Sequence, residues 1–198
     1  MNVEAVQRAL RTIGWRIAVD GQAGPETGRA VRAFQLGYAL GPALSVDGIA
    51  GPKSHEALDI CLDRDGRCSP SFRFRDFRSR GLEECADAGD GWIMVHRELV
   101  LGLEDYQDMI GQPVKIRYGY RCEKLNACVG GVKNSQHRTG VAADLVEATE
   151  TPARIKKLKR FSGLGLMPDG KVIHLDVRHV GDNPTGGTVE NPSTWNYG

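Results

Sequence analysis

Residues 134–145 read Asn-Ser-Gln-His-Arg-Thr-Gly-Val-Ala-Ala-Asp-Leu, and this stretch decides how the second part of the chain folds. Gly140 stands between His137 and Asp144 and argues against an uninterrupted helix. The more natural prediction is a turn or loop that carries His137, followed by a strand over residues 141–146 that carries Asp144.

A second stretch, residues 172–178, reads Val-Ile-His-Leu-Asp-Val-Arg and predicts another strand. His174 and Asp176 stand at positions i and i+2, so their side chains point to the same face. In many zinc enzymes, two histidines and one carboxylate hold the catalytic zinc, and a fourth position is left for water. His137, Asp144 and His174 are therefore candidate Zn²⁺ ligands. By spacing alone, such groups could equally be satisfied polar side chains of a core.

The N-terminal part contains an internal repeat. Residues 19–27, Val-Asp-Gly-Gln-Ala-Gly-Pro-Glu-Thr, return as residues 46–54, Val-Asp-Gly-Ile-Ala-Gly-Pro-Lys-Ser. In each copy Asp-Gly makes a tight turn and Pro begins a helix. Apolar residues at helical spacing precede the first turn and follow both turns: Val6, Leu10 and Ile13, then Ala30, Val31 and Phe34, then Ala57 and Leu58. We expect a three-helix domain over residues 1–62, whose few apolar residues form a small core.

Residues 63–75 are polar and turn-rich and predict a linker to a second domain over residues 76–198. Residues 72–78 alternate Phe with Arg. Such a mixture can mark a nucleic-acid surface, but an edge segment with its Phe side chains inward and its Arg side chains solvated is the preferred interpretation.

In the second domain, an apolar stripe predicts a long helix over residues 92–110, with His96 as a surface or packing residue. Residues 114–118 alternate like a strand. Thr151-Pro152 begins another helix, which Gly163 and Gly165 end. The predicted fold class is α+β.

The composition excludes several classes of function. Lys and Arg number 26 and Asp and Glu 25, so a formal charge of +1 gives no global attraction to nucleic acid or to an anionic membrane. No apolar run approaches the roughly 18 residues of a membrane span, and the first residues do not read as a signal peptide. We expect a monomer made in the cytoplasm, with no nucleic-acid partner and no membrane insertion.

The five cysteines are an odd number and lack the paired Cys-x-x-Cys spacing of a structural zinc site. We expect most of them to be free thiols. Cys61 and Cys68 could form a disulfide if the chain meets an oxidising compartment.

Residues 3–60 resemble the peptidoglycan-binding domain found at the ends of many cell-wall hydrolases. The matching motifs are Val6-Gln7-x-x-Leu10, Asp20-Gly21-x-x-Gly24-Pro25-x-Thr27, Ala30-Val31-x-x-Phe34-Gln35 and Asp47-Gly48-x-x-Gly51-Pro52. The resemblance implies a three-helix module that anchors the protein to peptidoglycan. Ala23 and Ala50 depart from the pattern, because larger apolar residues are common at those positions.

Residues 72–198 resemble the M15 zinc peptidases, which include D-alanyl-D-alanine carboxypeptidases and wall endopeptidases and share a fold with the hedgehog signalling domain. The matching motifs are Gly119-Tyr120-Arg121-Cys122, Asn134-Ser135-Gln136-His137-x-x-Gly140-x-Ala142-Ala143-Asp144 and Val172-Ile173-His174-Leu175-Asp176. The resemblance implies a small antiparallel sheet with helices on one side. It also implies that His137, Asp144 and His174 bind zinc, and that Arg121 and Ser135 hold oxygens of the substrate, with Arg121 supplying charge as the oxyanion forms.

One departure concerns the general base. Many members of the family place a carboxylate three residues before the last ligand, and Lys171 stands there. Either Asp176 is the base beside His174, or the register shifts so that His179 is the ligand and Asp176 again the base. We prefer His174, because it lies in the middle of the predicted strand. Asp176 would then take a proton from the zinc-bound water, whose pKa falls to about 7, and deliver it to the leaving amine.

A wall-binding module joined to a zinc peptidase predicts a phage-type endolysin that cuts a peptide bond of the peptidoglycan stem or cross-link. The alternatives are a D-alanyl-D-alanine carboxypeptidase and a zinc-containing wall-binding protein without turnover, which the lysine at position 171 favours. For Trp195, packing on the core is the default expectation over lining the cleft.

Overall fold

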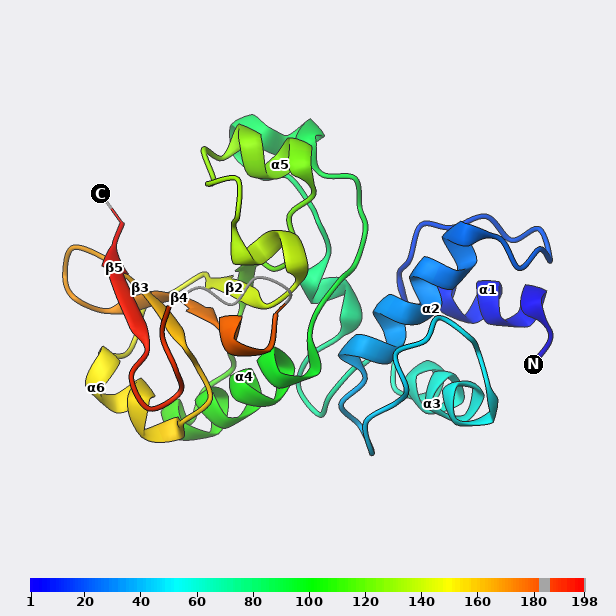
Figure 1. Cartoon of the computed structure of the whole chain (residues 1–198), viewed down its shortest axis with the longest axis horizontal. Helices are drawn as coiled ribbons and strands as arrows, with labels where there is room; N and C mark the ends of the chain where they lie inside the picture. The colour runs from blue at the N-terminus through cyan, green and yellow to red at the C-terminus, as the bar shows by residue number, and fades with distance from the viewer. Residues whose placement is uncertain (182–185, 198) are drawn as a thin grey trace.

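The computed structural model describes residues 1–181 and 186–197. A helical N-terminal part lies beside a larger part built on a β-sheet (Figure 1). The N-terminal part contains α1 (Val3–Ile13), α2 (Pro25–Gly37) and α3 (Pro52–Asp63), as the three-helix prediction requires. Pro25 and Pro52 each stand at the start of a helix, where the missing N–H donor costs nothing.

A buried glutamine holds each copy of the repeated turn. The Oε1 atom of Gln7 accepts hydrogen bonds from the backbone N–H groups of Asp20 and Gly21, at 3.1 and 2.8 Å. Gln35 does the same for Asp47 and Gly48, at 3.1 and 2.9 Å. The repeat therefore has a structural cause, since each Asp-Gly turn is tied to the helix that precedes it.

Within the described residues, five strands form one sheet in the order β1-β2-β4-β3-β5. They are β1 (Ile116–Tyr118), β2 (Ala142–Leu145), β3 (Gly163–Leu166), β4 (Val172–Asp176) and β5 (Ser193–Asn196). Helices and sheet together confirm the α+β class. The sheet is antiparallel, as expected, except at its edge strand β5, which pairs with β3 in parallel.

The long helix is shorter than predicted, because α4 covers Arg97–Ile110. His96 is its N-cap, and its side chain accepts a hydrogen bond from the Glu98 N–H at 3.2 Å. The apolar stripe begins earlier because Trp92 and Val95 are buried in non-helical backbone before the helix.

The remaining helices are short. The helix predicted from Thr151 ends early, as α6 (Pro152–Ile155) followed by a 3₁₀ turn, η4 (Lys156–Leu158). The turn predicted at His137 is a 3₁₀ turn, η3 (Gln136–Thr139). The sequence patterns did not predict α5 (Glu123–Cys128) or the 3₁₀ turns η1 (Phe74–Phe77), η2 (Glu83–Ala88) and η5 (Arg178–Val180). None of the helices in the described residues is long and apolar enough to cross a membrane.

The segment expected to be a linker is packed. Phe72, Phe74 and Phe77 are buried, which confirms the inward direction of the Phe side chains, although residues 74–77 form η1 rather than an extended edge. The Trp15 ring from the N-terminal part lies 5.0 Å from that of Phe74, and its Nε1 donates to the Ile93 carbonyl at 3.2 Å. The two parts therefore share one hydrophobic core.

The cysteine pairing differs from the one considered. Cys61 and Cys68 are buried free thiols, as is Cys122, whereas Cys85 and Cys128 form a disulfide. The paired cysteines are 43 residues apart, and η2 packs against α5 to bring them together. No local spacing in the sequence indicates such a pair.

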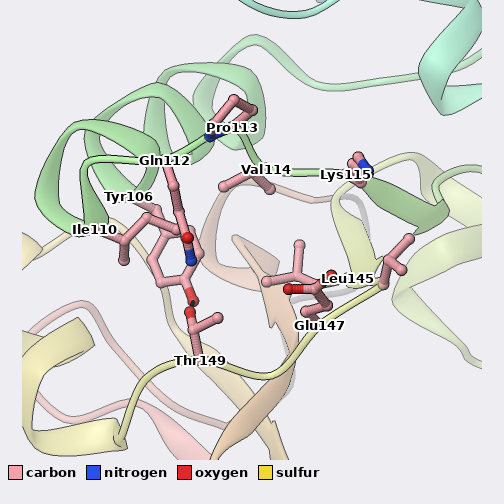
Figure 2. Close-up of a pocket in the computed structure, with 10 residues that line it drawn as sticks. Tyr106, Ile110, Gln112, Pro113, Val114, Lys115, Leu145, Glu147 and Thr149 are labelled. Atoms are coloured by element: carbon pink, nitrogen blue, oxygen red, sulfur yellow. Dashed lines mark hydrogen bonds between the residues drawn. The ribbon is translucent and has the colours of Figure 1, made fainter.

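A pocket of about 250 Å³ lies where the end of α4 meets β1 and the segment after β2 (Figure 2). On one side of it, the Tyr106 hydroxyl lies 2.8 Å from the Thr149 Oγ1 atom. The residues that line it do not include the histidines and aspartates singled out above.

Candidate metal centre

Three buried side chains from separate elements converge on one point. His137 comes from η3, Asp144 from β2 and His174 from β4, and their ligand atoms lie within 4.8 Å of one another. Asp144 pairs directly with His174 in the β2–β4 register. The Asp144 Oδ1 atom lies 2.7 Å from His174 Nδ1 and 3.2 Å from His137 Nε2, and these two nitrogens are 3.1 Å apart.

The turn before β2 fixes the His137 ring. Gly140 ends η3 in the left-handed region, with φ +73°, and an added Cβ would lie 2.8 Å from Met94 Cγ. The His137 Nδ1 atom lies 2.6 Å from the Gly119 carbonyl oxygen. Because a carbonyl can only accept, Nδ1 carries the hydrogen and Nε2 presents its lone pair to the cluster.

The register of the sheet brings one residue from each of the five strands into a single row at the site. Register places one row of residues on the same face: Tyr118, Asp144, His174, Gly165 and Trp195. Gly165 leaves room in this row, because an added Cβ would lie 2.9 Å from the His174 Cβ. An added Cβ at Gly163 would lie 2.2 Å from Asp176 Oδ2. The sequence analysis treated both glycines as helix stops and missed that they make space for the site.

Asp176 is fully buried, and both of its oxygens have partners. Its Oδ1 accepts from Arg178 Nε at 2.9 Å, and its Oδ2 accepts from Arg178 Nη2 at 2.6 Å. The Oδ2 atom also lies 3.2 Å from His174 Nε2. Asp176 thus contacts the ring nitrogen that faces away from Asp144 and His137. A carboxylate in that position orients a metal-binding imidazole.

Arg121 reaches the cluster from the chain that follows β1. Its guanidinium forms an ion pair with Asp144 and lies 4.7 Å above the Tyr118 ring. The Arg121 backbone N–H donates to the His137 carbonyl at 3.1 Å, which ties the two segments together. The Arg121 Nε atom is buried without a hydrogen-bond partner among the described residues, so one donor is available for a ligand.

The other predicted residues lie around this centre. Ser135 is the N-cap of η3, and it lines a surface pocket of about 260 Å³. The His179 Nδ1 atom lies 2.8 Å from Ser162 Oγ, and the group of metal-type ligands in the described residues contains His174 and not His179. Lys171 is exposed, with its Nζ 3.8 Å from Asp169 Oδ2.

The electrostatics of the cluster distinguish its two histidines. Burial lowers the pKa of His137. Burial also opposes a charge on His174, but hydrogen bonds with Asp144 and Asp176 raise its pKa to about 9. Burial alone would raise the pKa of Asp144, yet the two histidines hold it well below its usual value. Without metal, the His174 ring therefore holds a proton between the carboxylates of Asp144 and Asp176. Zn²⁺ binding to the same donors must displace this proton.

Trp195, for which lining of the cleft was the alternative expectation, forms an aromatic side of the site. The Trp195 ring meets the His174 ring edge-on at 5.0 Å, and the Arg178 guanidinium lies 4.9 Å from the Trp195 ring. Trp195 is half-buried and so does not pack in the interior as expected. Tyr197 lies next to it, with ring centroids 6.3 Å apart.

Comparison with known proteins agrees with this geometry. Residues 1–58 match the peptidoglycan binding domain family. The zinc D-Ala-D-Ala carboxypeptidase of Streptomyces albus G is 30% identical over 175 residues, which cover 84% of this chain and 65% of that protein. The chain thus spans just under two thirds of the length of that relative. Residues 76–176, about half of the chain, match Peptidase M15 and contain all three converging side chains. The chain therefore belongs to the Peptidase M15 family.

Proposed function

We propose that this protein is a zinc-dependent peptidase that hydrolyses a peptide bond in the stem or cross-link of peptidoglycan, and that its N-terminal helices bind the wall. The observation that carries the proposal is the buried convergence of His137, Asp144 and His174, with ligand atoms within 4.8 Å. Two imidazole nitrogens and one carboxylate are a donor set that suits catalytic zinc. The match of residues 1–58 supports the choice of peptidoglycan as the partner.

In this proposal His137 Nε2, His174 Nδ1 and the Asp144 carboxylate hold the metal. Zinc bound there supplies a Lewis acid and makes water acidic enough to react at neutral pH. The Gly119 carbonyl holds the His137 ring and Asp176 holds the His174 ring. Both rings are therefore already ordered before the metal binds.

Arg121 and Ser135 would bind the substrate. The unpartnered Nε of Arg121 suits a carbonyl or carboxylate oxygen, and its charge would stabilise the oxyanion as it forms. Ser135 would contribute a hydroxyl from the turn that carries His137.

Asp176 could act as a general base or as a residue that orients the His174 ring, and its contacts favour one of these two roles. The sequence suggests a general base, whereas its position at His174 Nε2 and its pairing with Arg178 favour an orienting role. We expect Asp176→Asn to weaken zinc binding by about 10- to 100-fold if it orients the ring. Competition with a chelating indicator measures this, and Asp169→Asn on the surface is the matched control. Unchanged zinc affinity together with lost turnover would instead support the base.

The test of the whole proposal is product release from purified peptidoglycan. The zinc-loaded protein is expected to free new amino groups, detected by mass spectrometry, and chelation should stop the reaction until zinc is restored. Free D-alanine as the product would support a carboxypeptidase, whereas larger fragments would support an endopeptidase. Binding to the wall with no release by the zinc-loaded protein would contradict catalysis and support a zinc-containing wall-binding protein.

A lytic role of the endolysin type is the finer form of this proposal. It rests on the presence, in one chain, of a segment that matches a peptidoglycan-binding domain and a segment that matches Peptidase M15. Loss of turbidity from a suspension of bacterial walls tests it, because a carboxypeptidase that only trims stems leaves the wall intact.

A further inference from the structure

The chain that follows β5 is held against the sheet beside the candidate metal centre. The Tyr197 backbone N–H donates to the Leu166 carbonyl at 2.8 Å, which continues the pairing of β5 with β3 by one residue. β5 is an edge strand of the sheet, next to β3 (Figure 1). The Tyr197 ring consequently lies close to His174, with ring centroids 6.3 Å apart.

The absence of a side chain at Gly165 leaves space for the Tyr197 ring. An added Cβ there would lie 2.4 Å from Tyr197 Cε2, nearer than real carbon atoms approach. The same Cβ would lie 3.2 Å from Trp195 Cε2, so the glycine admits both aromatic rings over β3. Tyr197 is nevertheless 38% exposed, so a molecule bound at the centre can reach it.

The phenol is a neutral hydrogen-bond donor in the field of the cluster. Burial and, to a smaller extent, Asp144 raise the pKa of Tyr197 to about 12, although Arg121 opposes the increase. The Trp195 ring lies beside the phenol ring, with ring centroids 6.3 Å apart. A neutral phenol carries one O–H, which it can donate to an acceptor oxygen of a bound molecule.

Tyr197 and Arg121 flank the cluster from opposite edges of the sheet. Arg121 lies over Tyr118, which is the β1 end of the row of residues that crosses the sheet. Tyr197 lies at the β5 end, with Asp144 and His174 between the two edges. A peptide bound over His174 would meet a donor on each side.

We propose that Tyr197 is a substrate-positioning residue, whose phenol O–H donates a hydrogen bond to a carbonyl or carboxylate oxygen of the peptide bound at the metal centre. The inference rests on the proposed peptidase function and adds a residue to it. Tyr197→Phe is the decisive variant, because it removes the donor but keeps the ring on Gly165 and the backbone bond to Leu166.

We expect Tyr197→Phe to lower kcat/KM for release of amino groups from peptidoglycan fragments by about 10- to 100-fold, the effect of losing a hydrogen bond to a charged or developing charged oxygen. Zinc content and the midpoint of thermal unfolding should stay at wild-type values, which a merely structural role would not predict. The matched control is Tyr106→Phe, which also loses a tyrosine hydroxyl, but one bonded to Thr149 in the pocket of Figure 2. That control should lose stability and keep its kcat/KM.

The outcomes separate this inference from the function on which it rests. Release by the wild type with kcat/KM of Tyr197→Phe within twofold of it would overturn the role of Tyr197 and leave the peptidase function standing. Loss of zinc or of the fold in Tyr197→Phe would also overturn it, by showing a structural role. Absence of release by the zinc-loaded wild type would instead contradict the proposed function itself.

Discussion

At the residue scale, two opposed influences set the pKa of His174: burial and hydrogen bonding. The ring is buried between Asp144 and Asp176, with ring nitrogens 2.7 and 3.2 Å from their oxygens. Burial disfavours the charged ring, but the two hydrogen bonds prevail and raise its pKa to about 9. A base whose pKa rises on folding stabilises the folded state fully below its unfolded pKa, about 6.5, and this contribution is lost as pH rises through the folded pKa.

We therefore expect the metal-free protein to lose on the order of 3 kcal/mol of its free energy of unfolding between pH 6.5 and pH 9. Urea unfolding with a chelator present measures this loss. His137 opposes this loss only near pH 6.5, because its pKa is lowered in the folded state while the unfolded chain is still partly protonated there. His174→Gln is the control and should show a nearly flat dependence. A wild-type stability that rises over the same range would contradict the assignment of the proton.

At the element scale, the disulfide between Cys85 and Cys128 fastens η2 to α5. The closed loop contains α4, β1 and Arg121, so it joins the helix that covers the sheet to the segment that reaches the metal centre. Replacing both cysteines by serine should destabilise the protein by about 4 kcal/mol, the chain-entropy value for a loop of this length.

Urea unfolding with and without a reducing agent tests the contribution of the disulfide. The reductant should lower the midpoint of the wild type toward that of Cys85→Ser/Cys128→Ser and leave the double variant unchanged. A wild type indifferent to the reductant would show that the bond adds no stability.

The elements that sequence reasoning predicted correctly are those that local patterns determine. Gly140 marks the turn before β2, and the alternation around His174 marks β4, so all three candidate ligands could be predicted from the sequence. The disulfide, the space above Gly165 and the position of Trp195 in β5 depend on contacts between residues far apart in the sequence. The capping role of His96 was missed because an apolar stripe continues through non-helical backbone before α4.

At the scale of the whole molecule, the N-terminal helices and the sheet-containing part meet in a closely packed contact. Gly37, the last residue of α2, is where the two parts approach: an added Cβ would lie 2.8 Å from Phe74 Cε1 and from Val95 Cγ1. Arg97 reaches from α4 to the Tyr38 carbonyl at 2.6 Å, so a polar bond accompanies the apolar contact. Such packing favours one cooperative unit over two parts that move independently.

We expect the protein to unfold in a single transition, and Gly37→Ala to lower its free energy of unfolding by about 1–3 kcal/mol through overpacking of this contact. Because the contact is shared, exchange-detected opening of α1 and of α4 should become easier by the same amount. Gly24→Ala is the matched control, since nothing lies within 4 Å of an added Cβ there. Separate transitions for the helical and sheet-containing parts, or destabilisation confined to α1, would contradict a shared core. Agreement would mean that the N-terminal helices keep a fixed orientation relative to the metal centre.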